Sequence, residues 1–416
     1  MDKKIIRDAR KRIKKIRQKD VEIVVQKEGE PVSGANVSVR MKEHQFLFGA
    51  NCYMYDDYEG LEMNEKFTEL FVKLFNYTMI PFHWGWFEPE YQEYNEPYTS
   101  NLIKWAKANN IKRKLHALIW DWVCPDWITD DDDITERYRE RISYIMENYS
   151  DDFNFIDLAN ETTVNDRYPN PVSRWIKEFG PLNMLEFGTK LVRSYKTEAN
   201  LLYNDWNVHQ DEYYDFLRKM RENNIDIDII GIQSHMHKER WSAEETMEII
   251  DRAAAFDWPL HFTECSICSG KPVGEINYTS EKAKTNEWSE TEKDLYSQAE
   301  YARDFYTLVF SHPAVEALSW FDFTDYRWLG APAGVVSDDL QIKPVYNTLD
   351  DLINNEWHSD VDLVTGSTGK CETHLFFGNY EITVDINGEK YTVNRDILRE
   401  SFYSGGGKPW RWVINL

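Results

Sequence analysis

The middle of the chain alternates short apolar runs with longer segments in which apolar residues recur every three to four positions. The short runs predict buried strands and the longer segments predict amphipathic helices. The predicted strands cover residues 46–50, 77–82, 114–120, 153–160, 200–205, 227–234, 260–265 and 315–323. Helices are predicted, among others, at 99–110, 134–149, 212–224, 242–256, 297–310 and 344–357. This order favours a parallel (β/α)8 TIM barrel at residues 46–357 over an open doubly wound sheet.

The two flanks of the chain show a different pattern, in which apolar and polar residues alternate singly. Residues 20–26, 35–41 and 380–393 have this period of two, and Asn387-Gly388 is a good hairpin turn. They predict a small accessory β module built from residues 1–45 and 358–416. In such a barrel the first strand begins, and the last helix ends, at the N-terminal face. We therefore expect the module on the side opposite the active site.

Composition and charge narrow the possible partners. The chain has 416 residues, 42% of them hydrophobic, which is enough for one large core and a smaller one. A formal net charge of -24 disfavours nucleic acids and anionic membrane surfaces as partners. The basic segment 3–19 has apolar residues at helical spacing, so we expect a helix docked on the protein body rather than a nucleic-acid arm.

Hydropathy, the start of the chain and the cysteines argue against a membrane protein, a signal peptide and a zinc site. No segment approaches the roughly 18 apolar residues of a membrane span, and the basic start lacks the apolar core of a signal peptide. The expected location is the cytoplasm, or the outside of the cell for a protein that has lost its signal. The five cysteines are scattered, which predicts reduced thiols and no zinc site. The acidic run at 130–133 precedes a predicted helix, which favours capping over calcium binding.

The candidate chemistry lies at the ends of the predicted strands. The stretch FIDLANETT begins as a buried strand and continues directly into Asn160 and Glu161. A buried carboxylate costs several kcal/mol unless something pairs with it. The C-terminal ends of the strands meet at the active site of a TIM barrel, and Glu264 ends the strand at 260–265. Two carboxyl groups on one rim are what glycoside hydrolysis requires, one as acid/base and one as nucleophile.

Other polar and aromatic residues fall on the same predicted rim. Gln233 and His235 end one strand, and His116 and Trp120 end another. Several tryptophans follow strand ends, and sugar rings stack on such aromatic faces. They include Trp84, Trp86, Trp320 and Trp328. A single histidine here would more often be a core residue, and a single tryptophan would more often serve packing. The combination with two carboxyl groups favours a sugar-binding cleft.

At these segments the chain resembles glycoside hydrolase family 10, the family of endo-β-1,4-xylanases. The family's Trp-Asp-Val-Val-Asn-Glu segment appears as residues 156–161, and its Thr-Glu-Leu-Asp segment appears as residues 263–266. The resemblance implies that Glu161 is the acid/base and Glu264 the nucleophile. It also implies that Asn160 binds the 2-hydroxyl group of the sugar.

The resemblance extends to further substrate-binding residues. Gln233 and His235 match the family's Gly-x-Gln-x-His segment, and His116 with Trp120 matches its third strand. Asn204, in LLYNDWN, lies in a segment similar to the fifth-strand motif of the family. The remaining two matches, Trp320 and Trp328, keep the spacing of the two tryptophans that roof the reacting sugar.

The chain departs from the family pattern near the predicted glycon side. The family has a Glu-Asn pair and a Lys after the second strand, which bind the sugar beyond the reacting one. Pro81, Phe82 and Gly85 stand at those positions. Ser266 replaces an Asp two residues past the nucleophile. A serine hydroxyl can orient His235 but brings no counter-charge.

Together these features predict a retaining hydrolase of β-1,4-xylosidic bonds in xylan or xylo-oligosaccharides, with or without decoration. The resemblance implies no cofactor and no metal. One alternative keeps the mechanism but changes the glycone to that of another β-glycoside. A second alternative is a catalytically inactive sugar-binding protein, and the presence of both glutamates argues against it.

Overall fold

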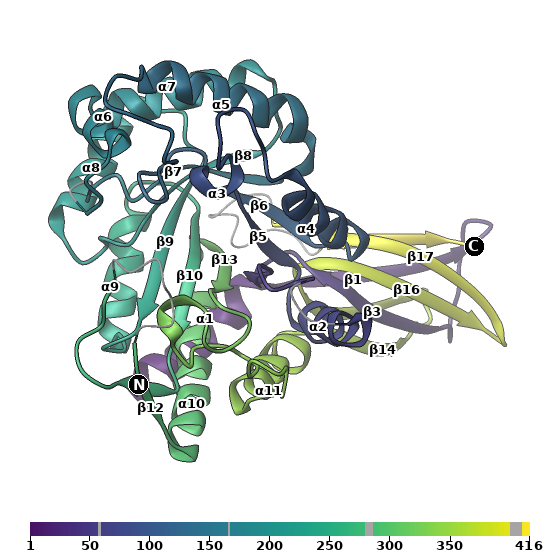
Figure 1. Ribbon diagram of the computed structural model, residues 1–416. Coiled ribbons are helices and arrows are strands. Elements are labelled where there is room, and N and C mark those ends of the chain that lie inside the picture. The colour runs from purple at the N-terminus through teal and green to yellow at the C-terminus, as the bar shows by residue number, and fades with distance from the viewer. Residues whose placement is uncertain (57–59, 165–166, 279–285, 400–409) are drawn as a thin grey trace.

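The centre of the protein is a closed barrel of eight parallel strands, in the order β10-β13-β4-β5-β6-β7-β8-β9 (Figure 1). The computed structural model describes residues 1–56, 60–164, 167–278, 286–399 and 410–416. The barrel strands are β4 (Leu47–Asn51), β5 (Tyr77–Pro81), β6 (Lys112–His116), β7 (Phe155–Asn160), β8 (Asn200–Asp205), β9 (Ile229–Met236), β10 (Leu260–Ile267) and β13 (Val315–Trp320). The expected (β/α)8 barrel is confirmed.

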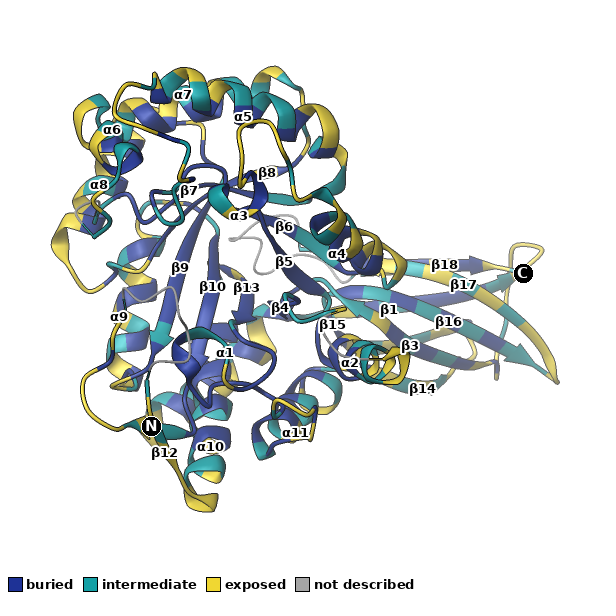
Figure 2. Ribbon diagram, in the orientation of Figure 1, coloured by how far each residue is buried: buried dark blue, intermediate teal, exposed yellow. Residues whose placement is uncertain are grey.

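Helices surround the barrel and cover its strands (Figure 2). The α-helices of this layer are α2 (Leu61–Leu74), α4 (Glu96–Ala108), α5 (Ile134–Tyr149), α6 (Pro171–Phe179), α7 (Pro181–Ser194), α8 (Asp211–Glu222), α9 (Ala243–Ala254), α10 (Glu292–Phe310) and α11 (Pro344–Asp351), and the short α3 (Trp84–Phe87) lies in the loop between β5 and α4. Short helical turns lie at Ser150–Asp152, Trp328–Gly330 and Leu352–Glu356, and strands β11 (Gly270–Pro272) and β12 (Trp288–Glu290) form a small ribbon. None of the helices in the described ranges has the length and hydropathy needed to cross a membrane.

Local sequence explains where these helices begin. Asp133 caps α5, because its side chain accepts a hydrogen bond from the backbone N–H of Glu136. Ser242 and Glu245 form a reciprocal capping box at the start of α9. Asp133, the last residue of the acidic run at 130–133, thus satisfies a backbone donor at the start of a helix, which is the capping role expected from the sequence.

The flanking strands form two four-stranded sheets that combine both ends of the chain (Figure 1). One contains β1 (Gln18–Lys27), β2 (Glu30–Pro31), β15 (Lys370–Phe376) and β18 (Trp410–Asn415), and the other contains β3 (Asn36–His44), β14 (Asp360–Val364), β16 (Gly378–Ile386) and β17 (Glu389–Ile397). Tyr380 and Trp412 pair across the sheets with ring centroids 5.9 Å apart. The predicted turn at Asn387-Gly388 joins β16 to β17 with positive φ at both residues.

The N-terminal helix α1 (Lys3–Ile16) packs on the barrel layer rather than on the sheets. It buries Ile6, Ala9 and Ile13, and the first two of these cluster with Ala243 of α9 and Leu308 of α10. The apolar stripe predicted in the basic segment is thus a docking surface, and Arg12 beside it donates a hydrogen bond to Ser311 at the end of α10.

Arg17 fixes the junction between α1, the sheets and the barrel. Its guanidinium donates hydrogen bonds of 2.7–2.8 Å to the backbone carbonyls of Phe310, His312 and Val315. Burial lowers the pKa of Arg17 to about 9. The guanidinium also lies 4.7 Å from the ring centroid of Phe46, next to the first barrel strand. One side chain therefore ties the flanking sheets to the last barrel strand and the helix before it.

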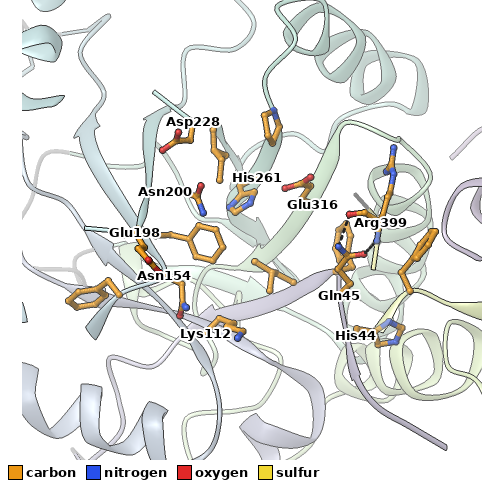
Figure 3. Close-up of a pocket in the computed structure, with 18 of the residues that line it drawn as sticks. His44, Gln45, Lys112, Asn154, Glu198, Asn200, Asp228, His261, Glu316 and Arg399 are labelled. Atoms are coloured by element: carbon orange, nitrogen blue, oxygen red, sulfur yellow. Dashed lines mark hydrogen bonds between the residues drawn. The ribbon is translucent and has the colours of Figure 1, made fainter. Parts of the chain in front are cut away.

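A polar cavity of about 750 Å³ lies at the N-terminal mouth of the barrel (Figure 3). Its wall combines residues at the start of several barrel strands with Phe376 of β15, Phe377 between β15 and β16, and Arg399 after β17. His261 of β10 contributes a ring that is 1% exposed, and neither ring nitrogen has a hydrogen-bond partner among the described residues. The two sheets thus border the barrel at the end opposite to the C-terminal ends of its strands.

We predict that His261 makes the fold sensitive to acid. Burial, together with Lys114, lowers the pKa of His261 to about 3, so the folded protein keeps this ring neutral while the unfolded chain protonates it near pH 6.5. The unfolded state then binds more protons, and stability falls as the pH drops from 6.5 towards 3. Relative to His261→Leu, the wild type should lose about 2 kcal/mol of unfolding free energy between pH 7 and 5. Urea unfolding of both proteins at the two pH values measures this loss. A difference in unfolding free energy between the two proteins that does not change with pH would contradict the prediction.

Candidate active site

A second cavity of about 750 Å³ opens at the C-terminal ends of the barrel strands. Most of the site residues predicted from the sequence lie in its wall, namely Trp86, His116, Trp120, Glu161, Gln233, His235, Glu264 and Trp328. Asn160 and Asn204 lie directly behind this wall, where both are at most 1% exposed. The barrel therefore brings together residues from β6, β7, β8, β9 and β10 that are far apart along the chain.

Glu161 follows directly after β7, in a conformation that turns the chain out of the strand. Its φ is 58°, which is uncommon for a residue other than glycine. Its side chain accepts hydrogen bonds from Gln233 Nε2 and Arg167 Nη1, each 3.0 Å long. Burial raises the pKa of Glu161 to about 8, although Arg167 acts in the opposite direction. At neutral pH this carboxyl group is mainly protonated.

Glu264 lies in β10 and, unlike Glu161, is ionised at neutral pH. Asn204 Nδ2 donates to its Oε1 at 2.7 Å, and His235 Nε2 lies 3.0 Å from its Oε2. Burial alone would raise the pKa of Glu264, but the hydrogen bond from His235 and the fields of His116 and Lys114 outweigh it and lower the pKa to about 2. The site therefore presents one carboxylic acid and one carboxylate at neutral pH, which suits acid and nucleophile roles.

Both carboxyl residues stand next to irregularities in the strand register. The pairing of β7 with β8 shifts between Asp157 and Ala159, and the pairing of β10 with β9 shifts between Phe262 and Glu264. Such β-bulges re-aim side chains at barrel rims. The shift directly before Glu264 accounts for a carboxyl group that leaves the alternation of β10, whereas the positive φ of Glu161 turns the chain out of β7.

Asn160 links the two carboxyl groups through amide side chains. Its Oδ1 accepts hydrogen bonds from Asn204 Nδ2 at 2.9 Å and from Gln233 Nε2 at 3.1 Å. Its Nδ2 is buried and has no hydrogen-bond partner among the described residues. Gly231 leaves space for this row of amide side chains (Gln233, Asn160 and Asn204), because a Cβ at position 231 would lie 2.4 Å from Asn204 Oδ1.

Two histidines complete the polar side of the cavity. His235 Nδ1 lies 2.9 Å from Ser266 Oγ, so the serine that replaces the family's Asp does contact this ring. His116 Nδ1 lies 2.6 Å from Asp157 Oδ2, and Lys114 Nζ lies 2.6 Å from the same oxygen. Asp157 is fully buried, and its contact with Nδ1 of His116 leaves Nε2 as the ring nitrogen that a ligand could reach.

The structure corrects two of the predicted tryptophans. Trp84 is 3% exposed and packs behind the wall, where its Nε1 donates to Glu88 at 2.8 Å. The turn of α3 places Trp86 on the cavity instead. Trp320 is fully buried and donates from Nε1 to the carbonyl of Ala333, because alternation along β13 directs this ring away from the cavity.

Other aromatic residues form the cavity surface that was predicted for Trp84 and Trp320. Phe321, one position after Trp320, lines the cavity and lies 4.8 Å from the ring of His235. Trp328 lies 4.3 Å from the same histidine ring, so its predicted place on the wall agrees with the structure. Trp120 also lines the wall, with ring centroids 5.5 Å from His116 and His83.

The departures from the family pattern leave an apolar surface beside β5. Phe82 is fully buried, and Gly85 has no space for a side chain, since a Cβ there would lie 2.9 Å from the carbonyl of Val123. The cavity wall here consists of His83, Trp86 and Trp122, with ring centroids 4.7–5.1 Å apart.

Sequence reasoning missed several cavity residues. Asn51 and Asp322 lie at the ends of β4 and β13 and share a hydrogen bond of 3.3 Å, so their strand-end positions could have revealed them. Arg167, Tyr168 and Trp206 lie in loops after β7 and β8. Loop residues of this kind carry no periodic signal, and the contact between Arg167 and Glu161 depends on the path of the loop.

Comparisons with known proteins agree with this geometry. The family model described as Glycosyl hydrolase family 10 matches residues 49–352. Endo-1,4-beta-xylanase B of Thermotoga neapolitana is 23% identical over 312 residues, which cover 70% of this chain and 84% of that protein. Anti-sigma-I factor RsgI6 of Acetivibrio thermocellus is 22% identical over 405 residues, which cover 94% of this chain and 48% of that protein. The chain thus spans about half the length of that relative.

Solved structures share the fold at low identity. The crystal structure of xylanase 10B from Thermotoga petrophila RKU-1 in complex with xylobiose has a TM-score of 0.61 and 20% identity. The match covers 75% of this chain and 95% of that one. The native xylanase 10B from Thermotoga maritima gives the same TM-score, over 96% of its chain. At this level of identity these matches support the barrel fold.

We predict that the two carboxyl groups titrate far apart. Carboxyl carbon NMR should place the Glu161 midpoint near pH 8 and keep Glu264 ionised down to about pH 2. In a Glu264→Gln variant the Glu161 midpoint should fall, because the negative charge of Glu264 is one of the causes that raise it. A wild-type Glu161 midpoint in the ordinary range, close to 4.5, would contradict the assignment of this residue as the acid.

Proposed function

The chain belongs to glycosyl hydrolase family 10, and on that premise we propose that it cleaves β-1,4-xylosidic bonds in xylan or xylo-oligosaccharides with retention of configuration. The observation that carries the proposal is the pair of buried carboxyl groups with opposite charge states on one cavity wall. Retaining glycosidases require this pair, one member as acid/base and the other as nucleophile.

In the first step, protonated Glu161 donates its proton to the oxygen of the glycosidic bond. Glu264 attacks the anomeric carbon as the bond to that oxygen breaks, and a covalent glycosyl-enzyme forms. Asn204 and His235 hold the attacking carboxylate. The new negative charge on Glu161 is matched by Arg167 and by the amide of Gln233.

In the second step, Glu161 acts as a base. It removes a proton from a water molecule, and the resulting oxygen attacks the anomeric carbon and displaces Glu264. Both carboxyl groups return to their starting states. Two inversions at the same carbon give net retention. All proton transfers use side chains of this chain, so the proposal needs no cofactor.

Xylose is the favoured glycone because relatives named as endo-1,4-beta-xylanases recur among the matches. The aromatic wall suits a sugar ring of this kind, since flat apolar faces stack on aromatic rings. A β-glycoside with another glycone remains the second candidate within the same mechanism. An inactive sugar-binding protein is the third, and the separated pKa values of Glu161 and Glu264 favour catalysis over it.

A panel of aryl β-xyloside, aryl β-xylobioside and aryl β-glucoside tests the proposed substrate. We expect hydrolysis of the two xylose compounds and little hydrolysis of the glucoside. Preference for the glucoside would indicate the second candidate. Binding of all three without turnover would indicate the third candidate and would refute the proposed activity.

The same panel measures the glycon subsite beyond the reacting sugar. Pro81, Phe82 and Gly85 offer no charged partner there, and a charged hydrogen bond contributes roughly 1.5 to 3 kcal/mol. We therefore expect kcat/KM to rise less than about thirtyfold from xyloside to xylobioside, and poor activity on plain linear xylan. A rise of about a thousandfold, or roughly 4 kcal/mol, would reveal a strong distal subsite and contradict this expectation.

Replacing each glutamate by alanine should separate their roles. Glu264→Ala should abolish turnover of every substrate, because no nucleophile remains. Glu161→Ala should retain activity on aryl glycosides whose leaving group needs no proton, and added azide should then give a β-azide product. NMR of the products shows whether the azide has formed and which anomeric configuration it has. Equal loss in both variants without an azide product would reverse or reject the assignment.

A further inference from the structure

Arg167 contacts the catalytic acid, and the two groups form an ion pair only while Glu161 is deprotonated. Its Nη1 lies 3.0 Å from Glu161 Oε2, and the two side chains are 25% and 9% exposed. Among the described residues, Glu161 is the only carboxylate within ion-pair distance of Arg167. The guanidinium is therefore balanced by Glu161 in one protonation state and not in the other.

The surroundings hold this guanidinium at the cavity wall. It lies 5.2 Å from the ring centroid of Tyr168 and 5.4 Å from that of Trp206. All three side chains line the cavity, and the Trp206 side chain is among the exposed aromatic surfaces of the protein. The cation is thus placed between two aromatic rings and remains within reach of a bound ligand.

Catalysis begins with Glu161 protonated, and a neutral carboxyl group no longer balances the charge of Arg167. The proton of Glu161 goes to the leaving oxygen, so Arg167 lies on the side of the cavity that receives the leaving sugar. A guanidinium fork matches the geometry of a carboxylate and can bind it through two parallel hydrogen bonds. A carboxylate on the leaving sugar would therefore replace the partner that protonation removes.

We propose that Arg167 forms a subsite for an anionic group on the leaving side of the substrate, with a uronic acid as the chemical class it takes. The inference rests on the proposed function, because it uses Glu161 as the proton donor. It adds a specificity-determining residue that acts on charge, in a protein whose net charge of -24 would otherwise disfavour acidic substrates. Screening by salt confines that long-range repulsion to about 10 Å, so the nearby cation of Arg167 determines whether an acidic group is attracted to this part of the cavity.

Binding of the carboxylate would also favour the acid form of Glu161. The charged groups that act on this residue are Arg167, which lowers its pKa, and Glu264 and Asp205, which raise it. A substrate carboxylate that engages Arg167 offsets the lowering effect of this charge, and the hydrogen bond from Gln233, which also lowers the pKa, stays in place. The acidic substrate would then keep the catalytic proton to higher pH than a neutral substrate does.

The test compares two substrates in the wild type, in two Arg167 variants and in one control variant. One substrate is a xylo-oligosaccharide with a single uronic acid on the sugar that leaves, and the other is its carboxyl-reduced counterpart. We expect the wild type to prefer the acidic substrate in kcat/KM by about tenfold or more, mainly through KM. Arg167→Gln should reduce this ratio to within about threefold of unity, and Arg167→Lys should keep an intermediate ratio.

Arg327 provides a matched control. It lines the same cavity, but its guanidinium is already paired with Asp338 and bonded to Thr324 Oγ1, so Arg327→Gln should leave the ratio of the two substrates unchanged. Folding of each variant is checked by thermal unfolding. The alkaline limb of the wild-type pH profile should lie at higher pH for the acidic substrate, and this difference should vanish in Arg167→Gln.

Three results would overturn the inference. The first is a wild type without preference for the acidic substrate, and the second is a preference that survives in Arg167→Gln. In both cases cleavage of the neutral oligosaccharide leaves the proposed function intact. The third is a wild type that cleaves neither oligosaccharide, which refutes the proposed function and the inference together.

Discussion

One row of hydrogen-bonded amides holds both carboxyl groups of the active site. Gln233 donates to Glu161, both Gln233 and Asn204 donate to the carbonyl oxygen of Asn160, and Asn204 donates to Glu264. An amide can donate and accept at once, so the row can serve a neutral acid at one end and a carboxylate at the other. Loss of any member would leave a buried polar group without its partner, which costs about 1–3 kcal/mol or more for a charge. The spacing and the charge states of the site both depend on this row.

The barrel makes the row possible because parallel strands present their C-terminal ends together. Below the row, Lys114, Asp157 and His116 form a second set of buried contacts within 2.6 Å. The fields of Lys114 and His116 reach Glu264 through an interior of low dielectric, where they act more strongly than they would in water. Glu161 lies at the rim, where burial dominates and Arg167 opposes it. Two carboxyl groups of the same type, both buried, therefore acquire different pKa values because their charged and hydrogen-bonding neighbours differ.

The sequence predicted the barrel, the strand that carries each glutamate and the apolar stripe of α1, because periodicity and strand-end position report burial directly. It did not predict which face of a strand or turn each tryptophan takes. Trp84 and Trp320 were expected at the cavity but are buried behind it. A helical turn and the alternation of β13 decide these orientations, and a strand end alone cannot specify them. Arg167 was missed because its contact with Glu161 depends on a loop path.

The two halves of the cavity wall differ in chemistry, and the difference bears on specificity. Beside β5 the wall is formed by His83, Trp86 and Trp122, whose rings contact one another and offer broad surfaces. Such surfaces bind by stacking and tolerate varied hydroxyl patterns. Beside Glu161 the wall carries the cation of Arg167. Discrimination by charge can exceed discrimination by apolar contact, because an unmatched buried charge costs more than a lost stacking contact. The side of the cavity beside Glu161 is therefore better suited to discriminate between ligands by charge than the aromatic side beside β5.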